Sequence, residues 1–152
     1  MRTGYRSPGQ PPDLATTGPG FGELLAAAAY SAVQLHGDDT DACRTDVWAA
    51  LVAQAVTRGV VVRRVRVVPG PGSARGEPIV PGEQVRWLPR SLTSTLPLPG
   101  NPFWLFDDRM VRFSVFGGDG LWRCWQFTSD REVVALCATA FESAWSWAVP
   151  RD

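Results

Sequence analysis

Apolar and polar positions alternate most clearly between residues 103 and 127, where three short strand-like segments follow one another. They are Phe103–Phe106, Met110–Phe116 and Leu121–Phe127. An Asp-Asp-Arg turn and a glycine-rich turn separate them, as in an antiparallel meander. In the middle segment Phe113 falls on one face and Arg112 on the other, so we expect a much smaller stability loss from removing Arg112. This aromatic-rich meander is predicted to form the centre of a sheet.

In the N-terminal half, segments typical of helices alternate with segments typical of strands. Phe21–Tyr30 is rich in Ala and Leu and predicts a short helix, and Ser31–His36 predicts a strand. Asp41–Arg58 carries one apolar stripe at helical spacing and is followed by Gly59, a typical residue just past a helix end. Val60–Val68 then reads as a buried strand, so this region predicts a parallel βαβ unit.

Two further elements complete the predicted domain. Glu83–Leu88 is expected to be a strand, and Asp130–Trp147 a helix opened by a capping box of Ser129 and Glu132. The Pro- and Gly-rich residues 1–20 predict a disordered leader. Residues 21–150 therefore predict a single α/β domain, with a mixed sheet flanked by helices.

Composition excludes several classes of function. The 152 residues carry no net charge, and no apolar run approaches the length of a membrane span, so a cytoplasmic protein without a membrane partner is expected. Cys43, Cys124 and Cys137 form no CxxC pair, which favours reduced thiols over a disulfide or zinc site. The single histidine, His36, removes most histidine-based metal and catalytic arrangements. We expect no metal and no cofactor.

Charged residues near the predicted strands are the candidates for chemistry. Arg63, Arg64 and Arg66 have the guanidinium geometry that suits phosphate, but zero net charge favours pairing with the chain's own carboxylates and argues against direct nucleic-acid binding. His36, Asp38 and Asp39 follow a strand end, where α/β sheets place ligands. They are able to form an acid/base pair or a weak metal site, although a turn with helix-capping aspartates is favoured over both.

Two other candidates have structural alternatives. Asp107-Asp108-Arg109 is either a remnant of a site or, as we prefer, a tight hairpin turn. Trp145 and Trp147 diverge by about 200° on one helix, so they do not both face inward. Trp147 is thus a candidate for a protein-partner surface, with closure of the core near the terminus as the alternative.

Four segments carry a resemblance to a known family: VRRVRVVPGP, VRWLPR, LPGNPFWLFDDRMVRFSVFGGDG and REVVALCATAFESAWSWAVP. They resemble an actinobacterial family of small proteins of unknown function. Its members are often encoded beside Xre-type helix-turn-helix regulators. The resemblance runs from about Phe21 to Pro150, and WLPR, which ends at Arg90, is among its specific parts. It implies a regulatory role with such a regulator as the protein partner.

The meander also resembles a phospholipase D-like half-domain, whose members carry His-x-Lys-x4-Asp before a strand hairpin. When Asp107 is aligned with that Asp, Gly100 stands at the His position and Pro102 at the Lys position. The resemblance therefore implies the phospholipase D-like fold without its chemistry, and we expect a non-enzymatic regulatory or interaction module. Its candidate ligand residues are His36, Asp38, Asp39, Arg64, Arg66 and Arg90. The alternative is a phosphate-ester or nucleotide-processing enzyme that uses His36 with Asp38 or Asp39 and the Arg63–Arg66 cluster.

Overall fold

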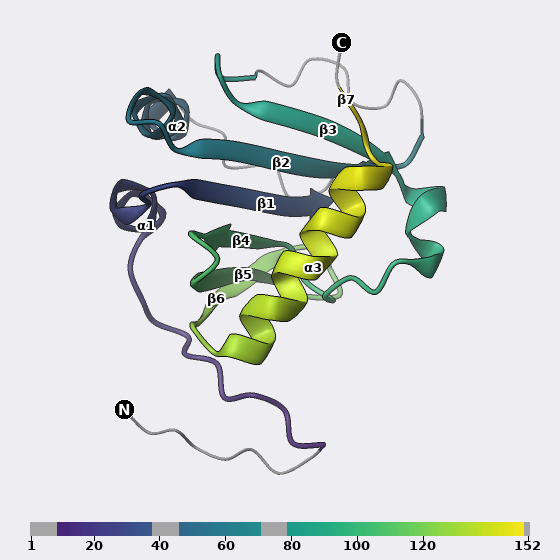
Figure 1. Ribbon diagram of the computed structural model, residues 1–152. Helices are drawn as coiled ribbons and strands as arrows, with labels where there is room; N and C mark the ends of the chain where they lie inside the picture. Colours follow the sequence, from purple (N-terminus) through teal and green to yellow (C-terminus); the bar gives the residue numbers. More distant parts are fainter. Residues whose placement is uncertain (1–8, 38–45, 71–78, 151–152) are drawn as a thin grey trace.

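One mixed sheet organises the computed structural model, which describes residues 9–37, 46–70 and 79–150. Its seven strands lie in the order β6-β5-β4-β1-β2-β3-β7 (Figure 1). The parallel strands are β1 (Ser31–Gly37), β2 (Val61–Val68) and β3 (Gln84–Pro89). The antiparallel strands are β4 (Phe103–Phe106), β5 (Met110–Phe116), β6 (Trp122–Thr128) and the short β7 (Val149–Pro150). The predicted α/β fold, with a parallel part and a meander, is confirmed.

The middle strand of the sheet is β1, not a strand of the meander. It pairs in parallel with β2 on one side and antiparallel with β4 on the other, so it joins the two halves. β6 lies at the edge, and Phe127 is its one buried residue. The sequence places the meander at the centre because its aromatic content is high, but pairing order depends on long-range contacts that a local pattern does not encode.

Helix α3 (Arg131–Trp147) crosses one face of the sheet (Figure 1). Its buried stripe includes Val133, Cys137, Phe141 and Ala144, and it packs on the side chains of the first five strands that point to this face. The cap of α3 differs from the predicted capping box. Asp130, rather than Ser129, accepts hydrogen bonds from the backbone N–H groups of Glu132 (3.0 Å) and Val133 (3.1 Å).

Helices α1 (Phe21–Ala27) and α2 (Asp46–Thr57) cover a second core on the opposite face, built around Leu25, Val52 and Ala55. Gly59 has φ +94°, as expected for the residue that ends α2. The remaining short element is the 3-10 helix η2 (Arg90–Thr95). None of the helices in the described ranges combines the length and the apolar character that crossing a bilayer requires.

The leader segment contacts the sheet where the structure describes it. Ala15 and Phe127 exchange two backbone hydrogen bonds, of 3.2 and 2.8 Å, at the open edge of β6. A Cβ atom on Gly18 would lie 2.8 Å from the Phe127 ring, so only glycine lets the chain approach so closely here. These contacts differ from the disorder that composition predicts over residues 1–20; residues 1–8 lie outside the described part.

The two faces of β5 are as predicted, but both are buried. Phe113 lies in the α3-side core with 7% of its surface exposed, and Arg112 on the other face is only 8% exposed. The much smaller stability loss expected for removing Arg112 thus no longer follows from its position on the other face, because that face is buried too. The aromatic rings of Phe21 and Trp125 cover its guanidinium.

Replacing Phe113 with Ala should lower the free energy of unfolding by about 3–5 kcal/mol, because it leaves a cavity in the α3-side core. Ser114→Ala, at the next and less buried position of the same strand, is the matched control and should change stability by less than about 1 kcal/mol. Equal losses in urea denaturation of the two variants would contradict this account of the core.

Candidate ligand-binding site

A polar layer lies on the sheet face beneath α1 and α2. Strand register places Gln34 beside Arg64 on β2 and beside Trp104 on β4, and Trp104 beside Arg112 on β5. Two residues further along β1, His36 is paired in register with Arg66 on β2, and Arg66 is paired with Trp87 on β3. We call the four residues Arg64, Arg66, Arg112 and His36 the cationic layer. Alternation along the strands directs all four side chains to one face.

The cationic layer is largely sealed from solvent. Arg64 and His36 are 1% and 2% exposed. Arg64 pairs with the buried carboxylate of Glu83, which also accepts a hydrogen bond of 3.0 Å from the backbone N–H of Val80. A buried charge requires a partner of this kind, because removing it from water is otherwise strongly unfavourable. The sequence predicts Glu83 as the first residue of a strand. In the structure β3 begins one residue later, at Gln84, and Glu83 forms the ion pair with Arg64.

Aromatic rings surround the guanidinium groups of the layer. Arg112 lies 4.0 Å from the centre of the Trp125 ring and 5.3 Å from that of Phe21, and Arg64 lies 5.2 Å from that of Trp48. Phe21 also contacts Trp104, with ring centres 5.0 Å apart. Cations and rings attract one another at these distances, so the rings help to fix the guanidinium planes.

Gln34 contributes an acceptor at the centre of this face. Its side-chain oxygen Oε1 is buried and accepts no hydrogen bond from any residue in the described part of the chain. Such an orphaned acceptor is unfavourable unless water or a ligand donates to it. Arginine side chains, which bind anions in many proteins, lie beside it, so this face holds the candidate ligand-binding residues.

The structure brings together three of the six candidate ligand residues. His36, Arg64 and Arg66 are members of the cationic layer, whereas Asp38 and Asp39 lie outside the described residues. Arg90 belongs to the other face: its Nη2 lies 3.5 Å from where a Cβ on Gly37 would be, and that Cβ would point to the α3 side. Arg90 and the cationic layer thus share an end of the sheet but not a face.

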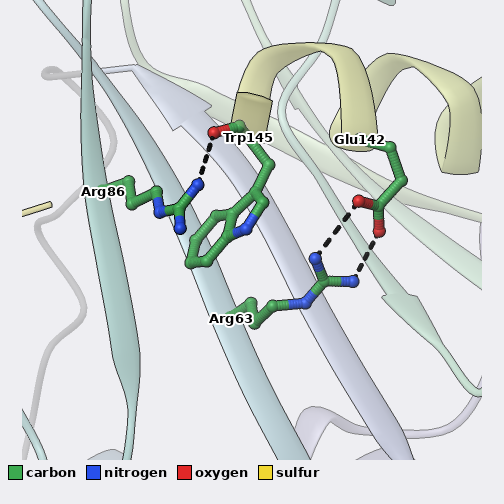
Figure 2. A network of polar contacts seen from close by, with 4 residues as sticks. All are labelled: Arg63, Arg86, Glu142 and Trp145. Atoms are coloured by element: carbon green, nitrogen blue, oxygen red, sulfur yellow. Dashed lines mark hydrogen bonds and ion pairs between the residues drawn. The ribbon is translucent and has the colours of Figure 1, made fainter. Parts of the chain in front are cut away.

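Arg63 serves the α3 face, as Figure 2 shows. Its guanidinium donates two hydrogen bonds, of 3.2 and 2.5 Å, to the carboxylate of Glu142 on α3. Arg86 donates to the carbonyl oxygen of Trp145 (2.9 Å) and lies 4.0 Å from the centre of its ring. These contacts tie α3 to β2 and β3. For Arg63 and Arg64, the predicted pairing with the chain's own carboxylates is confirmed.

The Asp107-Asp108 pair forms the predicted tight turn between β4 and β5, with φ of 51° and 50°. The carboxylate of Asp107 also accepts hydrogen bonds from the backbone N–H groups of Ala29 (2.8 Å), Tyr30 (2.9 Å) and Ser31 (2.9 Å). Partial burial opposes its ionisation, but these three donors and the Arg109 charge outweigh burial and lower the pKa of Asp107 below its ordinary value.

The same contacts end helix α1 early. The sequence predicts a helix to Tyr30, but α1 ends at Ala27, since the N–H groups of Ala29 and Tyr30 donate to Asp107 instead of to the preceding helical turn. Sequence reasoning missed this role because the two segments lie almost 80 residues apart. A pair of aspartates between two apolar runs signals the turn only.

Metal binding and thiol chemistry are the other reactions that the side chains of the described ranges could support. These ranges contain no group of three or more His, Cys, Asp or Glu side chains placed to hold a metal ion. Cys124 and Cys137 are free thiols, and burial raises the pKa of Cys137 to about 12, which keeps it protonated and unreactive. The prediction that these two thiols are at least partly buried is confirmed; Cys43 lies outside the described part.

The chain belongs to a family defined by a domain of unknown function, DUF6879, whose model matches residues 22–152. No curated protein matches the sequence significantly.

Solved structures that share the fold include the following three. NucT from Helicobacter pylori is 12% identical, with a TM-score of 0.62, over 86% of this chain and 87% of that one. Nuc from Salmonella typhimurium, a phospholipase D family member, is 11% identical, with a TM-score of 0.60 and the same coverage. TrmBL2, an archaeal chromatin protein that binds DNA, is 18% identical, with a TM-score of 0.61; the match covers 86% of this chain but 48% of TrmBL2. The predicted phospholipase D-like fold is confirmed.

Replacing Asp107 with Asn should lower the free energy of unfolding by about 1–2 kcal/mol at pH 7, because the ionised acceptor is lost while the turn geometry is kept. A lowered pKa contributes stability that is present above the unfolded-state pKa and is lost as pH falls through the folded-state pKa. The difference between variant and wild type should therefore shrink below about pH 4.

Asp108→Asn is the matched control for this experiment, because Asp108 shares the positive φ but is exposed. It should leave the unfolding free energy nearly unchanged at both pH values. If the difference in unfolding free energy between Asp107→Asn and wild type stays constant from neutral to acidic pH, the assigned role of the Asp107 charge is refuted.

Proposed function

We propose that this chain is a non-catalytic regulatory module with a phospholipase D-like fold, which binds a small ligand and acts with a helix-turn-helix transcriptional regulator. The observation that carries the proposal is the replacement of both catalytic positions. Gly100 and Pro102 stand where phospholipase D enzymes carry their nucleophilic His and their Lys. Neither residue supplies a nucleophile or a cation, so covalent phosphoryl transfer through this motif is absent.

The remaining residue of the motif has a structural use that supports this proposal. The carboxylate of Asp107 accepts hydrogen bonds from backbone N–H groups at the start of β1. This use requires no substrate, so the aspartate has a structural role that does not depend on the other two motif positions.

A regulatory role is supported by the match to TrmBL2, an archaeal chromatin protein with a novel mode of DNA binding. This chain spans about half of the length of that protein, so the shared fold there is one part of a larger DNA-binding molecule. We infer that the present chain works in a similar way beside a separate regulator in the cytoplasm. Its own zero net charge favours a protein partner over direct DNA contact.

The cationic layer is the proposed ligand site of the module. Its residues are three arginines and one histidine, Gln34 beside them has a buried acceptor, and aromatic rings line the same face. This combination suits a small molecule with an anionic group and a planar or apolar part.

One observation favours the enzymatic alternative. Leu35 pairs with Phe103, so His36 and Pro102 are the next residues on neighbouring strands. The single histidine of the chain thus lies beside the position that the family gives to its Lys. Phosphate-ester chemistry that uses His36 with the Arg cluster, and with Asp38 or Asp39, is therefore the second candidate function.

We expect no hydrolysis of a generic phosphodiester, such as bis(p-nitrophenyl) phosphate, above the rate without protein. The measurement compares wild type with His36→Ala, after circular dichroism has shown that the variant is folded. Wild-type turnover that disappears in His36→Ala would replace the regulatory proposal with the enzymatic one. Turnover that is equal in both would point away from His36 and would also contradict a non-catalytic module.

The tagged protein should co-purify with a helix-turn-helix regulator from its native cell, as identified by mass spectrometry. Trp147, at the end of α3, is 46% exposed and is the proposed centre of the partner surface. Trp147→Ala should therefore reduce the recovered regulator several-fold, as is usual for a buried aromatic anchor. Leu121→Ala, which removes an apolar side chain that is 61% exposed on another part of the surface, should not. Equal recovery with the two variants would rule out the Trp147 surface.

A further inference from the structure

A separate cavity of about 230 Å³ opens on the α3 face, away from the cationic layer. Val33 of β1 and Leu105 of β4 form its floor, and Ala138 and Phe141 of α3 form its wall. Val33, Leu105 and Phe141 are each less than 5% exposed. Tyr30 and Asp108, which are exposed, stand at its opening. The interior is therefore apolar and the entrance is polar, as in most small-molecule sites.

The cavity carries one uncompensated negative charge. Arg63 and Glu142, which also line it, neutralise each other through their two hydrogen bonds (Figure 2). Asp108 is the remaining charged residue of the lining, and its carboxylate makes no hydrogen bond or ion pair with a residue in the described ranges. A cation is thus the ligand group that the lining favours.

The backbone turn that carries Asp108 is held in place before any ligand arrives. Asp107 and Asp108 share the left-handed turn conformation, and three backbone hydrogen bonds fix Asp107 to the start of β1. The hydroxyl of Tyr30 donates to the carbonyl oxygen of Asp107, which fixes the Tyr30 ring at the same opening. A binding group on an ordered turn loses less backbone conformational entropy on binding.

The aromatic residues of the cavity also suit a cation. The guanidinium of Arg63 already lies 4.9 Å from the centre of the Phe141 ring, within the distance of cation–π attraction. Tyr30, which is 52% exposed, lines the cavity together with Asp108. An ammonium group at Asp108 would therefore lie near an aromatic residue as well as a carboxylate.

We propose that this cavity binds a small primary amine with an apolar or aromatic body. The ammonium group donates to Asp108, and the body lies against Val33, Leu105 and Phe141. The cavity volume of about 230 Å³ lies below the usual range for drug-sized ligands, so the expected ligand is small. This inference is independent of the proposed regulatory role, since it uses the other face of the sheet.

The test is a titration of the full chain with three matched probes: 2-phenylethylamine, 2-phenylethanol and phenylacetate. All three share a phenyl ring on a two-carbon unit, but they are cationic, neutral and anionic at pH 7. Amide chemical shifts measured by NMR should show saturable binding of the amine, centred on Ser31, Leu105 and Phe141. The alcohol should bind at least about fivefold more weakly, because it lacks the charge that Asp108 attracts.

Variants separate the cavity from general surface binding. Asp108→Asn keeps a residue that tolerates the positive φ, and it should weaken amine binding about fivefold to tenfold. Ala138→Leu fills the cavity without a change in charge and should weaken it by a similar factor. Asp13→Asn removes an exposed charge of the leader and should have no effect. Circular dichroism of each variant establishes that it is folded.

Three results would overturn the proposal. The first is the absence of saturable amine binding up to about 10 mM, the weakest dissociation constant expected for about nine non-hydrogen atoms at ordinary ligand efficiency. The second is equal affinity for 2-phenylethanol or phenylacetate. The third is amine binding that is unchanged in both folded variants, Asp108→Asn and Ala138→Leu. None of these results bears on phosphodiester hydrolysis or on the regulator, so the proposed function is tested separately.

Discussion

The junction between the two halves of the sheet depends on the carboxylate of Asp107. Three consecutive backbone N–H groups, from Ala29 to Ser31, donate to it, and the N–H of Asp107 donates back to the carbonyl oxygen of Ser31 (2.9 Å). These bonds end α1, begin β1 and set the antiparallel register of β1 with β4. Within the sheet itself, the other backbone link between the parallel strands and the meander is the four residue pairs of that short strand.

Much of this architecture could be predicted from local patterns. The apolar stripe of α2, the Gly59 that ends it and the alternation in β5 are each encoded in a few neighbouring residues. The early end of α1 could not be predicted, because its cause lies at Asp107. The burial of Arg112 was missed for a similar reason: the Phe21 and Trp125 rings that cover it come from the other end of the domain and from the next strand.

The candidate site was predicted only in part. Its residue types were visible in the sequence, since one histidine and three closely spaced arginines stand near strand ends. The assignment to faces required the register, which directs His36, Arg64 and Arg66 to one side and Arg63 to the other. Gln34 could not be identified as a candidate from the sequence, because an uncharged residue in a strand has no distinctive pattern. Its interest depends on the structure, in which its buried oxygen accepts no hydrogen bond from the described residues.

Arg63 and Arg64 show how one chain uses neighbouring arginines for different purposes. Arg63 pairs with Glu142, whose side chain is 57% exposed, and such solvated pairs contribute at most about 1 kcal/mol. Arg64 pairs with a carboxylate that is fully buried, and removing either partner would leave a charge without compensation. Arg64 is therefore a fixed part of the fold, whereas the Arg63 pair is a solvated contact that ties α3 to the sheet.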